Sequence, residues 1–261
     1  MLSMTSAPRL AGLLDAALAA AGAAAPVIMQ HYRSGTTVER KADDSPVTIA
    51  DREAELIIKA AIAGRFPDHG FLGEEFGAGG GDGGFVWIID PIDGTRNFVR
   101  GIPLFGTQIA LMQELRLVLG VSNMPAMDEL LYGGGGTAYL NGAPVRVSTI
   151  DRLAESAVSF AGLNRRRGPI RPENLIALFD AIERVRGFGD CYPFHLVASG
   201  RLEAVIQPQI KIWDIGALAA IIEAAGGRCT DLDGKPITIA TDGILASNGL
   251  IHDEILALIH R

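Results

Sequence analysis

The stretch that decides the fold is FVWIIDPIDGTRNF, residues 85–98. Its first five residues are apolar, which indicates a short buried β-strand over 85–89. The strand runs directly into Asp90 and Asp93, and the proline between them restrains Asp90 to an extended conformation. We therefore expect the two carboxylates to converge on one point at the end of the strand.

The residues that follow add an anion site at the same point. Gly94 permits close approach of the backbone, and a helix that opens at Gly94-Thr95 would direct its free N–H groups there. An anion next to two carboxylates requires cations between them, and oxygen-only ligands favour Mg²⁺ or Mn²⁺ over zinc. A surface turn is the ordinary explanation of an isolated Asp-x-x-Asp.

Further acidic residues occur where other elements are expected to begin or end. Glu74 and Glu75 follow a short predicted strand at 71–72, and Asp214 stands at the start of an apolar helix predicted over 215–225. A helix cap would explain Asp214 alone, and a solvated charge would explain Glu75 alone. Asp51 is expected in the first turn of a helix over 51–65, in a capping box with Thr48. Together, these acids favour a metal site.

Strand-like and helix-like runs alternate along the whole chain, which predicts sheets covered by helices. Two strands at 106–112 and 117–122 form a predicted hairpin, and 77–84 is expected to be a glycine-rich loop. At 261 residues we expect one compact unit with two halves, residues 1–150 and 151–261, of which the first carries most of the metal ligands.

Composition limits the possible partners. The net charge of −7 argues against a nucleic-acid binder. Two distant cysteines argue against a disulfide framework and favour a reduced, cytoplasmic setting. The apolar stretch 10–25 predicts an opening helix that packs on the domain; a secretory signal is the alternative. No other apolar run is long enough to cross a membrane, so we expect no membrane partner.

Three motifs in this order resemble the inositol monophosphatase family of Mg²⁺-dependent phosphomonoesterases. They are GEE at 73–75, DPIDGT at 90–95 with Asn97-Phe98, and WD at 213–214 with EAAGG at 223–227. The resemblance extends over nearly the whole chain, from Val47 to Asn248. It implies a layered α-β-α-β-α sandwich, a homodimer and a small phosphorylated metabolite as substrate.

Carried over by position, the resemblance implies two or three Mg²⁺ ions per site, with Mn²⁺ as an alternative. The metal ligands would be Glu74, Asp90, the Ile92 carbonyl, Asp93 and Asp214. Thr95, with Asp51 and Glu74, would orient and activate the attacking water. The phosphate would lie at Asp93 and at the backbone N–H groups of Gly94 and Thr95.

The substrate side departs from the inositol phosphatases. Arg96 stands where they typically have a second Thr, and the run 90–101 is similar to family members that cleave histidinol phosphate. We therefore expect hydrolysis of L-histidinol phosphate, a step of histidine biosynthesis. The expected substrate-binding residues are Arg96, Arg186, Asp190, Tyr192 and Gln207.

Two alternatives remain at this point. Gln207 stands where the family usually has a substrate-binding Glu, so an inositol monophosphatase or a broad sugar-phosphate phosphatase is the first alternative. The second is a non-catalytic phosphate- or metal-binding module. A non-catalytic module would be expected to have lost acidic residues of the site, whereas Glu74, Asp90, Asp93 and Asp214 are all present.

The sequence generates one direct test. Asp93→Asn removes a charge from the expected metal site at nearly constant volume, so it should abolish phosphate release without unfolding the chain. The measurements are a Mg²⁺-dependent phosphatase assay and a thermal unfolding curve. Full activity in this variant would contradict the assignment of the site.

Overall fold

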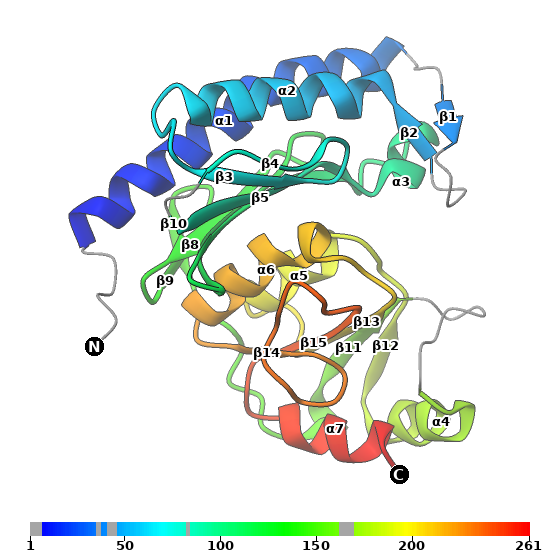
Figure 1. The fold of residues 1–261 in the computed structure, drawn as a ribbon. Helices are drawn as coiled ribbons and strands as arrows, with labels where there is room; N and C mark the ends of the chain where they lie inside the picture. The colour runs from blue at the N-terminus through cyan, green and yellow to red at the C-terminus, as the bar shows by residue number, and fades with distance from the viewer. Residues whose placement is uncertain (1–6, 35–37, 41–45, 82–83, 162–169) are drawn as a thin grey trace.

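The computed structural model, which describes residues 7–34, 38–40, 46–81, 84–161 and 170–261, has two sheets and three layers of helices (Figure 1). Helices α1 (Ala7–Ser34) and α2 (Ile49–Ala63) cover an eight-stranded sheet, and α5 (Tyr192–Ala198) and α6 (Ile212–Ala224) lie between that sheet and a five-stranded one. The last layer is α4 (Pro172–Ala181) with α7 (His252–Ile259). The predicted α-β-α-β-α sandwich is confirmed.

Both sheets are mixed. The larger has the order β10 (Ala143–Val145), β9 (Thr137–Leu140), β8 (Glu129–Gly134), β7 (Arg116–Met124), β6 (Gly106–Gln113), β5 (Phe85–Asp93), β3 (Gly70–Gly73), β4 (Gly77–Gly79). The smaller has the order β12 (Arg184–Arg186), β11 (Ala157–Phe160), β13 (Ala204–Pro208), β15 (Gly243–Ser247), β14 (Arg228–Thr230). Outside them lie the pair β1 (Val38–Arg40) and β2 (Pro46–Thr48), the five-residue helix α3 (Thr95–Val99) and a 3₁₀ turn at Leu153–Glu155.

Strand β5 is longer than the sequence predicts, and it contains a bulge. It pairs parallel with β3 and antiparallel with β6, and its register against β6 shifts between Asp90 and Asp93. Residues three apart on a regular strand face opposite sides of the sheet. The extra residue in the bulge offsets this alternation, so both carboxylates turn to the same side.

Helix α1 packs along α2 and the larger sheet. Its buried side chains are mostly small, which lets the helices approach closely: Leu13, Ala17, Ala20, Ala21, Ala24 and Ile28. By length and composition this helix would also be able to cross a membrane, a property that apolar core helices share. The expected opening helix that packs on the domain is confirmed.

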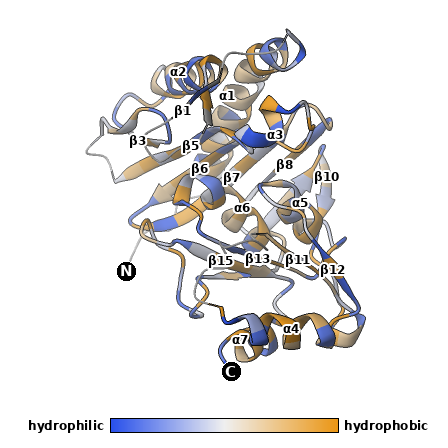
Figure 2. Cartoon of the chain, turned by 90° about the vertical axis from the view of Figure 1, so that its right-hand side faces the viewer, coloured by the Kyte–Doolittle hydropathy of each residue, from blue (hydrophilic) through white to orange (hydrophobic). Residues whose placement is uncertain are grey.

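Helix α6 lies between the two sheets (Figures 1 and 2). Apart from Asp214 in its first turn and Glu223 near its end, it is apolar around its circumference. A helix of this kind is stable only when it is buried all round. Its residues belong to a core cluster that also contains Ile88 and Ala110 from the first half of the chain and Val205 and Ala246 from the second. The halves on either side of residue 150 therefore share this core.

The glycine-rich segment over 77–84 is only partly the loop that the sequence predicts. Gly77–Gly79 pair with β3 as β4, while residues 82–83 lie outside the described residues. Backbone hydrogen bonds to a neighbouring strand need no side chains, so residue type alone did not indicate this strand.

The contact between α6 and β7 should tolerate no added methyl group. A Cβ at Gly120 would overlap the backbone of Ala217, so Gly120→Ala should lower the free energy of unfolding by about 1–3 kcal/mol. Gly22→Ala is the control, because nothing lies within 4 Å of that position in α1. It should raise the free energy of unfolding by about 0.5–1 kcal/mol. Denaturant unfolding measures both, and equal stability of the two variants would contradict this description.

Candidate active site

Three aspartates from two elements converge at the end of β5. Asp90 and Asp93 come from β5 and Asp214 from the first turn of α6, and each offers a carboxylate oxygen within 4.8 Å of the others. Asp90 is 1% exposed and Asp93 7%. Within the described part of the chain, Oδ2 of Asp93 is buried with no hydrogen-bond partner.

Glu74 joins this cluster from the neighbouring strand. Its backbone N–H donates to the carbonyl of Ile89 at 3.0 Å, which continues the pairing of β3 with β5 up to the metal-site end. Glu74 lines a cavity of about 210 Å³ together with Asp90, Asp93, Gly94, Thr95, Arg96, Asp190, Gln207, Gln209, Ile210 and Asp214. One cavity thus contains four of the five residues expected to bind metal.

Burial and mutual repulsion make this cluster costly without a cation. Burial, followed by repulsion from Glu74, Asp93 and Asp214, raises the pKa of Asp90 well above its ordinary value. The pKa of Asp93 is raised well above its ordinary value by burial first and then by Asp190, Asp214 and Glu74. The pKa of Asp214 rises to about 7, mainly through burial. An oxygen-only donor set with a partnerless buried oxygen fits Mg²⁺.

Asp51 is held by the start of α2. The backbone N–H and the hydroxyl of Thr48 donate to its Oδ2 at 2.7 and 2.6 Å, so the predicted capping box is confirmed. Its Oδ1 is buried and has no partner among the described residues. Burial, with repulsion from Glu75 and Glu74 as a smaller cause, raises the pKa of Asp51 to about 7. A partnerless oxygen with this pKa is suited to accepting a proton near neutral pH.

The helix expected to open at Gly94-Thr95 is present as α3. Gly94 precedes it with φ +87°, and a Cβ there would lie 2.8 Å from the carbonyl oxygen of Leu104, so the position requires glycine. The hydroxyl of Thr95 donates to the Ile92 carbonyl at 3.1 Å. The first N–H groups of a helix have no partner within it, and those of α3 lie on the cavity wall.

Asp190 brings a further carboxylate to the cavity. It has a left-handed backbone, φ +55°, and its Oδ2 accepts from the side-chain amide of Asn97 at 2.8 Å. Burial raises its pKa to about 6, although attraction to Arg96 opposes the shift. Cys191, not Asp190, is at the N-cap position of α5, so Asp190 does not serve as the cap of that helix.

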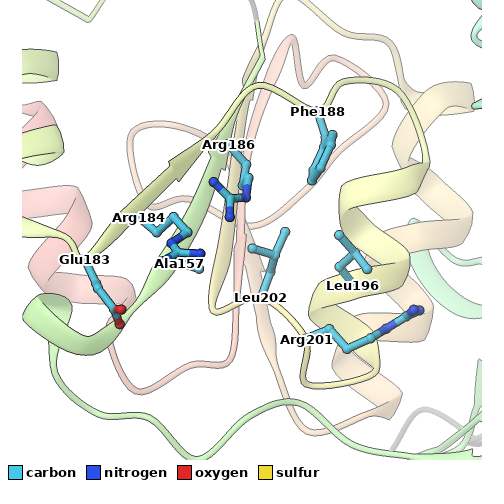
Figure 3. A pocket seen from close by; sticks show the side chains of 8 residues that line it. All are labelled: Ala157, Glu183, Arg184, Arg186, Phe188, Leu196, Arg201 and Leu202. Atoms are coloured by element: carbon cyan, nitrogen blue, oxygen red, sulfur yellow. The ribbon is translucent and has the colours of Figure 1, made fainter.

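The other expected substrate residues are divided between two places. Gln207 lines the metal cavity, and its Oε1 is buried without a partner in the described part of the chain. Arg186 instead lines a second cavity, of about 390 Å³, into which it projects from β12 beside Arg184 (Figure 3). Tyr192 packs edge-on against Phe188, with ring centroids 5.3 Å apart. Neither Arg186 nor Tyr192 is among the described residues that line the metal cavity.

Some residues of this region were missed by sequence reasoning. Gln209 and Ile210 line the cavity from the segment between β13 and α6, and Gln209 has φ +56°. Gln108 pairs with Asp90 across β5 and β6, and both side-chain amide atoms are buried without a partner among the described residues. Its polar side chain next to the apolar run Ile109–Met112 was the available signal.

Comparison with known proteins agrees with this geometry. Residues 10–261 match the model of the inositol monophosphatase family. The chain belongs to this family. The chain is similar to a histidinol-phosphatase from Chlorobaculum parvum, at 40% identity over 94% of this chain and 96% of that protein. A histidinol-phosphatase from Mycobacterium tuberculosis is 39% identical over 84% of this chain and 86% of that one.

A solved structure with the same fold is the Thermotoga maritima IMPase. It superposes with a TM-score of 0.86 at 32% identity, covering 95% of this chain and 97% of that one. Family membership together with the clustered carboxylates makes the protein a metal-dependent phosphomonoesterase.

The raised pKa values predict how Mg²⁺ binding depends on pH. In the metal-free protein, Asp51 and Asp214 have pKa values of about 7, above their ordinary value of 3.8. Their contribution to folding stability is therefore full below about pH 4 and is lost as the pH rises through 7. Mg²⁺ binds the ionised carboxylates, so it should raise the melting temperature more at about pH 8 than at about pH 5.5.

Calorimetry in buffers of different ionisation enthalpy should also detect proton release when Mg²⁺ binds at about pH 6. The variant Asp233→Asn, which removes an exposed carboxylate that pairs with Lys235 away from the cluster, is the control and should show the same stabilisation and proton release as the wild type. The same Mg²⁺ stabilisation at both pH values, without proton release, would contradict the burial of the cluster.

Proposed function

We propose that the protein hydrolyses L-histidinol phosphate to L-histidinol and phosphate. The observation that carries the proposal is the buried Asp190 carboxylate, which lines the same cavity as Asp93 and Gly94. Histidinol carries an ammonium group and an imidazole, and a buried carboxylate next to the phosphate site is complementary to such a cation. The similarity to two histidinol-phosphatases supports the same substrate.

The phosphate end would be held by the N–H groups of Gly94 and Thr95, with Arg96 at the rim. Glu74, the Ile92 carbonyl, Asp90, Asp93 and Asp214 would hold Mg²⁺, which would supply positive charge to offset the carboxylates and the charge of the phosphoryl group. With that charge in place, the N–H groups orient the phosphate.

The general base would be built from Asp51, Thr95 and Glu74. The hydroxyl of Thr95 donates to the Ile92 carbonyl, which leaves its oxygen able to accept a hydrogen bond from the attacking water. The proton of that water would pass to Oδ1 of Asp51, which is buried and partnerless among the described residues. The other oxygen of Asp51 is held by Thr48, so its orientation is fixed.

Gln207 would accept a hydrogen bond from the organic part of the substrate through Oε1. An amide gives up the charge-assisted part of that contact, which leaves Asp190 as the carboxylate that faces the ammonium. An inositol or sugar phosphate is the second candidate, favoured by the similarity to the Thermotoga maritima IMPase. We also propose a cytoplasmic homodimer; the two buried free cysteines accord with a reducing compartment.

The test is phosphate release from L-histidinol phosphate and myo-inositol 1-phosphate in parallel, with and without Mg²⁺. We expect kcat/KM for histidinol phosphate to be larger by about tenfold or more, because unpaired buried polar groups penalise the wrong substrate. Faster hydrolysis of the inositol ester would reject the substrate and retain the phosphatase. Light scattering at assay concentration tests the dimer.

Two substitutions should separate the roles of the polar residues. Asp190→Asn should raise KM for histidinol phosphate about 10- to 100-fold, because a charged hydrogen bond is worth about 1.5–3 kcal/mol. Gln207→Glu should lower that KM and leave kcat nearly unchanged, because it adds a charge towards the ammonium. Unchanged KM in both variants would contradict an ammonium-bearing substrate.

A further inference from the structure

A second acidic residue of α2 lies beneath the turn that carries Glu74. Glu55 is one helical turn after Asp51, and its side chain is 0% exposed. Its Oε2 accepts the backbone N–H of Glu75 at 2.8 Å, and its Oε1 accepts that of Phe76 at 3.4 Å. These are the two residues that follow Glu74 in the turn between β3 and β4.

The surroundings of Glu55 enclose its carboxylate. The ammonium of Lys59 lies 3.3 Å from Oε1 and over the rings of Phe71 and Phe76, 5.8 and 5.5 Å from their centroids. Gly73 packs so close that any Cβ there would overlap the Glu55 carboxylate. Glu55 is not among the described residues that line the metal cavity, and its carboxylate oxygens accept hydrogen bonds from Lys59 and from the two N–H groups of the turn.

These contacts fix the direction of Glu74 from two sides. β5 holds its backbone, because the N–H of Glu74 donates to Ile89. Helix α2 holds the rest of the turn, because Glu55 accepts hydrogen bonds from the next two backbone N–H groups. Successive backbone N–H groups that point to one side form a common binding site for an anion, which here is the Glu55 carboxylate. A buried carboxylate is costly unless it is paired, and the Glu55 carboxylate is paired with this turn and with Lys59.

We propose that Glu55 is a positioning residue for metal binding: through the backbone of the β3–β4 turn it sets the Glu74 carboxylate beside Asp90. The proposal rests on the proposed function in one respect, the role of Glu74 as a metal ligand. Helix α2 then serves the site twice, with Asp51 in its first turn and Glu55 in its second.

Glu55→Gln tests the proposal, because an amide keeps the size but cannot accept from both N–H groups. We expect the dissociation constant for Mg²⁺, measured by calorimetry, to rise about 10- to 100-fold, the usual effect of a residue that orients a metal ligand. The KM for Mg²⁺ should rise in parallel, with kcat largely recovered at saturating Mg²⁺. Hydrogen exchange at the amides of Glu75 and Phe76 should become faster.

The matched control is Glu53→Gln on the same helix. Glu53 pairs with His31 and its side chain is 46% exposed, so this variant removes an equal charge away from the turn. It should bind Mg²⁺ as the wild type does. Equal Mg²⁺ affinity in Glu55→Gln and Glu53→Gln would overturn the proposal.

A double-mutant cycle with Glu74→Gln identifies the route of the effect. If Glu55 acts through Glu74, Glu55→Gln should weaken Mg²⁺ binding much less in the Glu74→Gln background than in the wild type. Additive losses would overturn the positioning role. Unchanged Mg²⁺ affinity in Glu74→Gln alone would overturn the assignment of Glu74 as a ligand, and the proposal with it. If Glu74→Gln binds Mg²⁺ weakly while Glu55→Gln binds it as the wild type does, only the positioning role of Glu55 is overturned.

A shorter carboxylate provides a second variant in case Glu55→Gln does not fold. Glu55→Asp keeps the charge next to Lys59 but falls one methylene short of the turn. It should weaken Mg²⁺ binding by about tenfold. Wild-type Mg²⁺ affinity in folded Glu55→Asp would overturn the proposal.

Discussion

The fold of this protein must hold several carboxylates of like charge close together in a buried site. Asp90, Asp93 and Asp214 place carboxylate oxygens within 4.8 Å of one another, and burial raises the pKa of each. Burial and mutual repulsion oppose this cluster in the absence of cations, so the rest of the fold must impose it. The bulge in β5 turns two of the carboxylates to one side, and the packing of α6 between two sheets brings the third to meet them. The burial of a largely apolar helix thus contributes part of the free energy that assembles a charged site.

Two of the site's aspartates also act as helix caps. Asp51 accepts the N–H of Thr48 and Asp214 accepts the N–H of Lys211, each at 2.7 Å and each from the third residue of its helix. One oxygen of the carboxylate is used to start the helix, and the other is available to the site. The helix-cap interpretation of Asp214 is therefore compatible with its expected role as a metal ligand, because the cap fixes the rotamer that a metal site would require.

Sequence analysis succeeded where the determinants are local. The strand before Asp90, the helix at Gly94-Thr95 and the capping box of Asp51 each follow from a few neighbouring residues. It was incomplete where the partner lies far along the chain. The β5 bulge depends on the register against β6, the strand at Gly77–Gly79 depends on pairing with β3, and the placement of Arg186 in the second cavity depends on the edge position of β12. Glu55 had a weak local signal, its spacing of four from Asp51, but its contact with the Glu74 turn spans twenty residues.

The residues expected to bind metal and those expected to contact the organic part of the substrate lie on different kinds of backbone. The carboxylates expected to bind the metal stand on or directly beside strands and helices, whereas Asp190 and Gln209 have left-handed backbones in connecting segments. Such conformations are uncommon for residues other than glycine and persist only where the surroundings impose them; Asn97 does so for Asp190. Because connecting segments tolerate substitution better than the elements that they join, the organic part of the substrate can change while the metal site stays the same. This explains how relatives named for histidinol phosphate and for inositol phosphate share one fold with this chain. We therefore expect the part of the cavity wall that contains Asp190 and Gln209, rather than the metal site, to select the substrate of this protein.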